Sequence, residues 1–228
     1  MNAPGDAGHD VGVSPRAAVI FDMDGVLVDS ELQWKLSEGE HIRRLLPRWG
    51  DADSARIVGL GVVELHGFLV EQYGLEEPRD SFLALLDASA ADIYGRRVTL
   101  TEGLPELLGE LGRRRIPVGL ASSSPRRWIR LVLERFSLAG SFSAVAGGDE
   151  TPGRTKPEPD LYLVAAERLG ARPSACLAVE DSRLGVTAAK RAGLSCLGFR
   201  SAHNADQDLS GADAEIRRLA DLLLHLGP

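Results

Sequence analysis

The sequence has little cysteine, no long apolar run and no excess of positive charge, and each shortage excludes a class of protein. Its two cysteines, Cys176 and Cys196, stand inside apolar segments, which is typical of reduced core thiols rather than of a disulfide framework. No stretch of about 18 apolar residues occurs, so the sequence predicts no membrane span. The formal net charge of −7 argues against nucleic acid and anionic membranes as partners.

Targeting features are also missing from the first residues. Residues 1–15 have neither a basic start nor an apolar centre, unlike a secretion signal, and their Gly, Pro and Asp content predicts a flexible N-terminal tail. A chain of 228 residues, 44% of them hydrophobic, suffices for one core domain with an insertion. We therefore expect a cytoplasmic protein. The sequence carries no signal for an oligomer, so a monomer is the working expectation.

What the sequence does contain is a series of short apolar runs with helical segments between them. Each run has the length of a buried strand and no polar–apolar alternation, as in a parallel sheet covered on both faces. The predicted strands are 17–21, 116–121, 142–146, 175–179 and 194–199, and the helices between the later ones are 125–136, 157–169 and 182–192. This order predicts an α/β fold with a doubly wound parallel sheet.

The interval between the first two runs has hardly any strand signal. Its helical patterns lie at about 32–46, 53–58, 62–73, 79–97 and 103–114. We interpret all but the last as an inserted all-helical cap. The predicted division is a tail at 1–15, a core at 16–29 and 99–228, and a cap at 30–98.

Carboxylates follow two of the predicted strands at the point where each ends. Asp22 and Asp24 come after the first run, and Glu180 and Asp181 come after the fourth. Since the carboxyl ends of parallel strands meet at one edge of a sheet, we expect these acids to converge. Like charges in close contact repel by about 4 kcal/mol per pair at an effective dielectric of about 20. Either some take up protons or a cation joins them, and oxygen donors without nearby His or Cys favour Mg²⁺.

The other strand ends carry the opposite chemistry. The second run closes on "ASSS", so Ser122 offers hydroxyl and backbone donors just before a helix N-terminus, where an anion binds well. Lys156 follows the third run and is the only lysine between positions 36 and 189. A compact ammonium suits a transferring phosphoryl group. Helix caps, solvated acids and a surface lysine are the alternative interpretation, which the shared sheet edge disfavours.

These residues resemble a known family. "FDMDGVLVD" at 21–29, the serine after the second strand, "KPEPDLY" at 156–162 and "EDS" at 180–182 are similar in order and spacing to the four motifs of the haloacid dehalogenase-like superfamily. The resemblance runs from about residue 17 to 224. The inserted helices resemble the cap of the branch that contains β-phosphoglucomutases and sugar-phosphate phosphatases. The resemblance implies a Rossmann-like core with this helical cap.

The resemblance also implies a Mg²⁺-dependent phosphatase that hydrolyses small phosphate monoesters through an aspartyl-phosphate. In such an enzyme Asp22 is the nucleophile, and Asp24 protonates the leaving alcohol and then deprotonates water. The metal would be held by the Asp22 carboxylate, the Asp24 main-chain oxygen and Asp181, with Glu180 as a ligand or as support for one.

The phosphoryl oxygens have their own expected partners. By the same resemblance, Ser122 and Lys156 hold these oxygens, and backbone donors at Met23 and Ser123 assist. The cap closes over the site and excludes water until the phosphoenzyme has formed.

Within the superfamily, Asp24 disfavours the dehalogenases and the phosphonate-cleaving enzymes, which lack an aspartate there. The β-phosphoglucomutases have a histidine twelve residues after the nucleophile and an arginine three after a cap glycine. The matching residues here are Trp34 and, counted from Gly59, Val62. This favours simple hydrolysis, with a β-phosphoglucomutase-type phosphotransferase as the alternative. We hypothesise that Trp34 lines the pocket and packs on a sugar face.

A third interpretation is a non-catalytic regulator that binds a phosphorylated metabolite. Such a protein is expected to have lost Asp22, Asp24 or Lys156, and this chain retains all three. The expected partner is a small phosphorylated metabolite, most simply a sugar phosphate. Phosphoglycolate, a nucleotide or pyrophosphate stay open as alternatives.

Overall fold

A computed structural model provides the fold of residues 17–50, 53, 56–57 and 60–227. The predicted tail at 1–15, Gly59 and residues 54, 55 and 58 of the expected helix at 53–58 lie outside the described residues. Within the described part of the chain, no helix combines the length and apolar character that a bilayer crossing requires.

Six parallel strands form the central sheet, in the order β3-β2-β1-β4-β5-β6. The strands are β1 Ala18–Phe21, β2 Val118–Ser122, β3 Ala144–Gly147, β4 Cys176–Glu180, β5 Ser195–Phe199 and β6 Ala214–Ile216. The predicted doubly wound sheet is confirmed, because the chain moves outward from β1 on one side and then on the other. The sequence analysis missed β6, whose three residues include the exposed Glu215.

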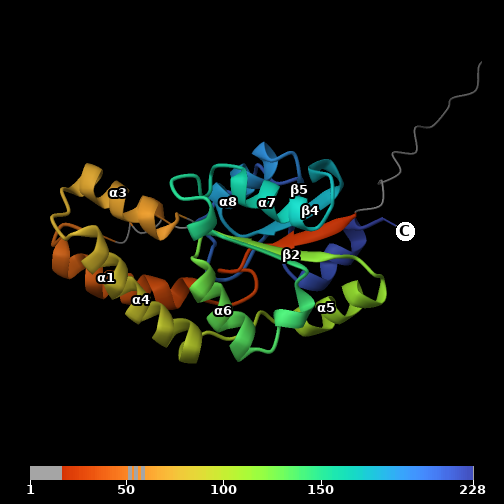
Figure 1. The fold of residues 1–228 in the computed structure, drawn as a ribbon, viewed down its shortest axis with the longest axis horizontal. Coiled ribbons are helices and arrows are strands. Elements are labelled where there is room, and N and C mark those ends of the chain that lie inside the picture. The colour runs from red at the N-terminus through yellow and green to blue at the C-terminus, as the bar shows by residue number, and fades with distance from the viewer. Residues whose placement is uncertain (1–16, 51–52, 54–55, 58–59, 228) are drawn as a thin grey trace, which may run out of the picture.

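Helices cover both faces of this sheet (Figure 1). One face packs against α5 (Leu104–Arg113), α6 (Arg126–Arg135) and a 3-10 segment at Leu219–His225. The other packs against α7 (Asp160–Arg168) and α8 (Arg183–Arg191). Val19 and Phe21 belong to the first apolar cluster, and Ala18 and Ile20 to the second. Burial on both faces is the reason that the strands show no polar–apolar alternation.

The inserted segment is helical, and it lies at one end of the core (Figure 1). It contains α1 (Glu31–Leu45), α3 (Val62–Tyr73) and α4 (Arg79–Asp92). The pattern at 79–97 is not one α-helix, because a π-helical turn at Ile93–Arg97 follows α4. Buried Leu69, Phe82 and Leu86 are part of its apolar interior.

The two connections between the insertion and the core pair with each other. Val28 and Leu100 form an antiparallel bridge. The backbone N–H and the hydroxyl of Thr99 donate to the two carboxylate oxygens of Asp29, at 2.5 and 2.9 Å. These contacts lie beside the two boundaries predicted for the cap, between residues 29 and 30 and between residues 98 and 99. The division into core and cap stays a prediction.

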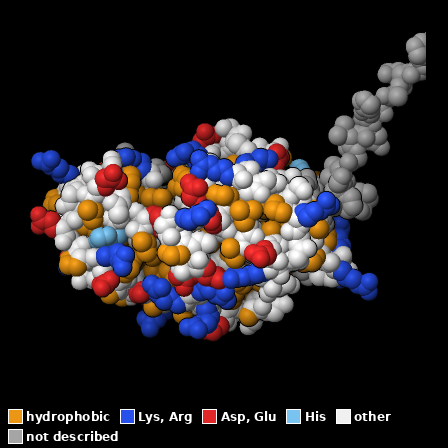
Figure 2. Space-filling model, turned by 45° about the horizontal axis from the view of Figure 1, so that its top comes forward, with side chains coloured by type: hydrophobic (Ala, Val, Ile, Leu, Met, Phe, Trp, Pro, Cys, Tyr) orange, Lys and Arg blue, Asp and Glu red, His pale blue; other side chains and the backbone are white. Residues whose placement is uncertain are grey.

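The surface carries charges of both signs. On the face shown in Figure 2, acidic and basic side chains are interspersed, with apolar side chains between them. The exposed ion pairs follow the same mixing: Lys190 with Asp213, Arg191 with Glu158 and Arg113 with Glu110. Such exposed pairs contribute little to stability.

Candidate active site

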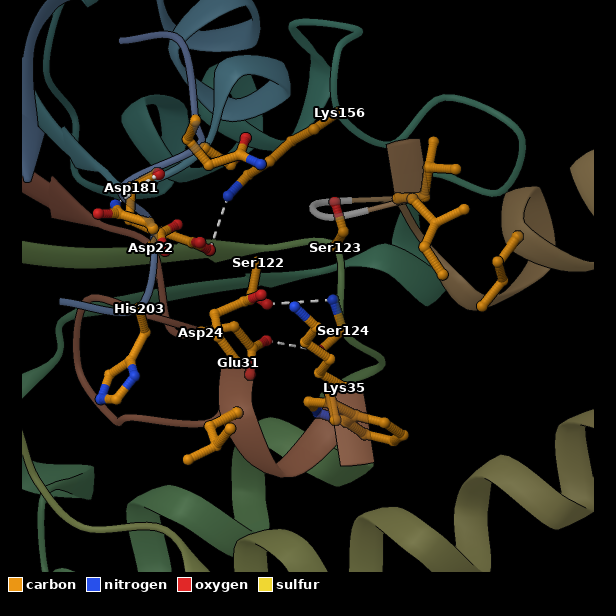
Figure 3. A pocket seen from close by; sticks show the side chains of 18 of the residues that line it. Asp22, Asp24, Glu31, Lys35, Ser122, Ser123, Ser124, Lys156, Asp181 and His203 are labelled. Atoms are coloured by element: carbon orange, nitrogen blue, oxygen red, sulfur yellow. Dashed lines mark hydrogen bonds and ion pairs between the residues drawn. The ribbon is translucent and has the colours of Figure 1, made fainter. Parts of the chain in front are cut away.

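A cavity of about 330 Å³ lies where the carboxyl ends of β1, β2 and β4 meet the cap. Figure 3 shows Asp22, Lys156 and Asp181 gathered on one side of it, with Glu31 and Lys35 of α1 on the opposite side. Among the core residues that line the cavity are Asp22, Asp24, Ser122, Ser123, Ser124, Lys156 and Asp181. The sheet edge therefore brings together the acids, the serines and the lysine that the sequence placed at separate strand ends.

Three of the predicted acids form a compact buried cluster. Carboxylate oxygens of Asp22, Glu180 and Asp181 lie within 4.8 Å of one another. Burial raises the pKa of Asp22 and Asp181 well above the usual aspartate range; Lys156 opposes this shift, and neighbouring carboxylates add to it. A buried group of carboxylates of this kind could hold a metal ion.

Asp181 has one carboxylate oxygen without a partner. Its Oδ2 is buried and has no hydrogen-bond partner in the described structure. Gly25 packs directly against this carboxylate, at a φ of +72°, and a Cβ at that position would collide with Oδ2. Only glycine allows the loop after β1 to approach Asp181 this closely. The amide nitrogen of Asn204 fixes the Asp181 segment by donating to the main-chain oxygens of Asp181 and Phe199, each at 2.8 Å.

Lys156 is buried inside the acid cluster. Its Nζ lies 2.6 Å from Oδ1 of Asp22 and 2.5 Å from Oε1 of Glu180. Burial alone would lower the pKa of Lys156, but the two carboxylates raise it above the ordinary lysine value. Glu180 is the last residue of β4 and also accepts a hydrogen bond of 2.5 Å from the Tyr162 hydroxyl. Both donors reach the same Oε1, and the part of Glu180 in holding a metal stays a prediction.

The Asp24 carboxylate accepts three hydrogen bonds. The hydroxyls of Ser30 and Tyr94 donate to Oδ1, each at 2.6 Å, and the Ser124 hydroxyl donates to Oδ2 at 2.9 Å. Our sequence analysis missed all three donors. Ser30 directly follows "FDMDGVLVD" and Ser124 is the last residue of "ASSS", so these motifs could have indicated both. Tyr94 is 70 positions from Asp24, and no local pattern marks it.

The loop after β2 presents the predicted serines. The hydroxyl oxygen of Ser122 accepts a hydrogen bond of 3.0 Å from the Ser124 backbone N–H, and the buried Ser123 Oγ has no partner within the described residues. Helix α6 begins at Arg126, two residues after Ser124, so its N-terminus points to this loop. The Met23 side chain is fully buried in the core, which leaves its backbone to serve the site. The role of Met23 stays a prediction.

The cap side of the cavity is mainly apolar. The half-buried Trp34 lines the cavity, as hypothesised, and its ring stacks on that of Trp128 in α6, with centroids 5.1 Å apart. The Trp34 indole N–H also donates to the Tyr94 hydroxyl at 2.9 Å. Apolar side chains from the cap extend this wall: Leu32, Ile57, Leu60, Val62, Leu65 and Leu86.

Polar residues that the sequence analysis did not select complete the lining. Glu31 and Lys35 stand one turn apart on α1, and Glu31 contributes to the raised pKa of Asp181, after burial. On the core side, the loop after β5 adds His203, Asp206 and Gln207. No motif pointed to this loop, because only the tertiary structure brings it beside β4.

At the sheet edge of this α/β core, buried aspartates, a lysine and a serine loop gather under a helical cap. This combination is suited to an enzyme of phosphoryl transfer. A sequence profile of the haloacid dehalogenase-like hydrolases matches residues 17–193. The phosphorylated carbohydrates phosphatase of Thermotoga maritima is 32% identical over 181 residues, or 78% of this chain and 82% of the relative.

Two further similarities cover more of the chain. The β-phosphoglucomutase of Bacillus subtilis is 31% identical over 228 residues, 92% of each chain. In fold, the crystal structure of CbbY from Rhodobacter sphaeroides in complex with phosphate superposes with a TM-score of 0.79 at 24% identity, over 92% of this chain and 99% of CbbY. The chain belongs to the haloacid dehalogenase-like hydrolases, in the branch of β-phosphoglucomutases and sugar-phosphate phosphatases. It is a phosphoric monoester hydrolase.

Proposed function

We propose that the protein hydrolyses small phosphate monoesters, above all sugar phosphates, in a Mg²⁺-dependent reaction that passes through an aspartyl-phosphate on Asp22. The observation that carries this proposal is the Asp22 carboxylate, buried at the cavity floor beside Lys156 and Asp181. The name of the phosphorylated carbohydrates phosphatase, similar over most of this chain, supports the substrate class.

The acid cluster suits a magnesium ion in its donor chemistry. The Asp22 and Asp181 carboxylates and the Asp24 main-chain oxygen would hold the ion, and the buried Oδ2 of Asp181 lacks any other partner among described residues. When bound, the ion offsets the repulsion among the carboxylates and polarises the phosphoryl group. Glu180 holds Lys156 in place rather than competing for the ion.

The chain's own residues divide the chemistry between them. Asp22 attacks phosphorus, forming an O–P bond while the bond from phosphorus to the leaving oxygen breaks. Asp24 gives its proton to that leaving oxygen and later removes one from the water that attacks the phosphoenzyme. Lys156 and the Ser122 hydroxyl hold the phosphoryl oxygens, and the apolar cap wall limits the entry of water.

The cap lining favours hydrolysis over a mutase reaction. A mutase has to grip a second phosphate, which calls for basic groups on the cap. Of the described cap residues that line the cavity, only Lys35 is a cation, and the carboxylate Glu31 stands one turn before it on α1. Trp34 and Val62 occupy places where β-phosphoglucomutases carry basic residues. The alternative is tested by supplying glucose 1-phosphate with and without a bisphosphate primer: glucose 6-phosphate as product would support the mutase.

The proposed activity is tested by phosphate release. The wild-type protein is incubated with p-nitrophenyl phosphate and with a panel of sugar phosphates, in Mg²⁺ and in EDTA. We expect release that depends on Mg²⁺; folded protein that releases no phosphate from any substrate would favour a non-catalytic regulator. The monomeric state, the cytoplasmic location and the absence of nucleic acid and membrane partners stay predictions from the sequence.

A further inference from the structure

We propose that Tyr94 is a positioning residue for Asp24: its hydroxyl holds Oδ1 of the carboxylate so that Oδ2 is the oxygen that exchanges a proton with the substrate. This inference rests on the acid–base role proposed above for Asp24. It concerns a residue of the π-helical turn after α4, which lies outside the family's motifs along the sequence.

The hydrogen bonds fix which way the Tyr94 proton points. An indole N–H is a donor only, so the Tyr94 oxygen accepts from Trp34, at 2.9 Å. The single hydroxyl proton of Tyr94 is then available to Oδ1 of Asp24 at 2.6 Å, a charged acceptor much closer than the Ser124 hydroxyl oxygen at 3.5 Å. The Tyr94 hydroxyl is therefore the donor in its contact with Asp24.

The two oxygens of Asp24 differ in their partners. Oδ1 accepts from both Ser30 and Tyr94, which fills its two lone-pair directions. Oδ2 accepts only from the Ser124 hydroxyl, and a hydroxyl can rotate to another acceptor. Oδ2 is thus the oxygen with room for a proton and for the leaving-group oxygen of a substrate.

The tyrosine is itself held from several sides. Its side chain is fully buried, and the guanidinium of Arg135 donates to the main-chain oxygens of Tyr94 and Arg96, at 2.9 and 3.1 Å. Trp34, which orients the hydroxyl, stacks on Trp128 of the core. The Trp128 ring is held in turn, because its indole N–H donates to Asp87 of α4 at 2.6 Å. Cap and core together fix the position from which Tyr94 acts.

A merely structural role makes a different prediction from a positioning role. If the hydroxyl only fills hydrogen bonds in the folded core, its removal would change kcat for all substrates alike. A hydroxyl that positions a general acid matters only where the leaving group needs a proton. An alkyl phosphate such as a sugar phosphate needs it, and p-nitrophenyl phosphate needs it little.

The test is Tyr94→Phe, which removes one oxygen and keeps the ring. We expect kcat to fall about tenfold for a sugar phosphate that the wild type hydrolyses, as a part of what a general acid contributes. For p-nitrophenyl phosphate, kcat stays within about twofold of the wild type. Combined with Asp24→Asn, Tyr94→Phe causes no further loss. The matched control is Tyr73→Phe, whose hydroxyl donates to Asp53 on the cap, away from the cavity lining, at 2.5 Å.

Equal losses on both substrates, or no loss on either, would overturn the proposal. If Tyr94→Phe does not fold, Trp34→Phe serves instead, because it removes the N–H that orients the Tyr94 proton and keeps an aromatic ring. The readout is kcat at saturating substrate, because a lost sugar contact is expected in KM instead: kcat should fall for the sugar phosphate and not for p-nitrophenyl phosphate. A kcat loss shared by both substrates, or a change in KM alone, counts against the positioning role. Failure of the proposed function is distinguishable, since the wild-type protein would then hydrolyse neither substrate.

Discussion

The Nζ atom of Lys156 lies 2.6 Å from Oδ1 of Asp22, and only 1% of the lysine side chain is exposed. Lys156→Met leaves Asp22 and Glu180 buried without their shared cation. We expect the free energy of unfolding to fall by about 3–5 kcal/mol and phosphate release to be lost. Removing one partner of a buried ion pair leaves the other charges buried and uncompensated. Chemical denaturation measures the first effect. The control, Lys190→Met, removes an exposed pair and should cost under about 1 kcal/mol; equal effects of the two variants would contradict the structure.

Asp22→Asn tests covalent catalysis. The amide has almost the same size as the carboxylate but cannot attack phosphorus, so turnover should be abolished. The fold should be retained, because Glu180 still pairs with Lys156. After quenching with acid, no phosphate bound to the protein should be detected in this variant. Asp80→Asn, at a side chain 97% exposed on α4, is the matched control and should retain full activity. Hydrolysis above a few per cent of wild type in Asp22→Asn would refute the aspartyl-phosphate route.

Asp24→Asn separates the acid role from binding. The substitution should slow sugar phosphates by about 10²-fold or more and p-nitrophenyl phosphate far less, because the nitrophenolate leaves without a proton. Steady-state kcat values for the two substrates provide the comparison. Equal losses on both would remove Asp24 from the acid role.

Trp34→Ala tests whether the cap tryptophan contacts the substrate. We expect a higher KM for a sugar phosphate, since an aromatic face for the sugar is lost, together with lower stability from the lost stacking on Trp128. Trp49→Ala is the control: Trp49 is buried in the cap, packs on Tyr73 and does not line the cavity. It should lower stability and leave KM unchanged. An unchanged KM in Trp34→Ala would reject the substrate contact.

Removal of the metal should lower stability as well as activity. A ligand that binds only the folded state stabilises it by about 2.7 kcal/mol at a hundredfold excess over its Kd. We therefore expect Mg²⁺ to raise the melting temperature of the wild type and EDTA to reverse the shift. Asp181→Asn should reduce the Mg²⁺-dependent shift strongly, and Asp80→Asn should not. A shift that survives in Asp181→Asn would place the ion elsewhere.

The fold was predictable from local pattern and from one rule of topology. Short unalternating apolar runs identified five of the six strands, and the spacing of apolar residues predicted α3 at Val62–Tyr73 with its observed bounds. Strand ends were less certain: Ser122 and Glu180, expected just beyond their strands, are the last residues of β2 and β4. The predicted helix at 157–169 begins at Asp160 because Pro157 and Pro159 precede it.

The main members of the site were predictable for the same reason. Parallel strands that alternate with helices bring their carboxyl ends to one edge, so Asp22, Ser122, Lys156 and Asp181 had to meet if the sheet formed. A sequence therefore determines convergence of this kind without any knowledge of side-chain packing.

Only the tertiary structure decided the finer contacts. Tyr162 and Lys156 reach the same oxygen of Glu180, and Tyr94 and Ser124 meet Asp24 from 70 and 100 positions away. Contacts over such separations depend on how the cap packs against the core, which no local periodicity encodes. The sequence by itself determined which groups arrive at the sheet edge. The packing of the cap on the core decided the orientation of each group, because hydrogen bonds depend on distances and angles that only the assembled chain defines.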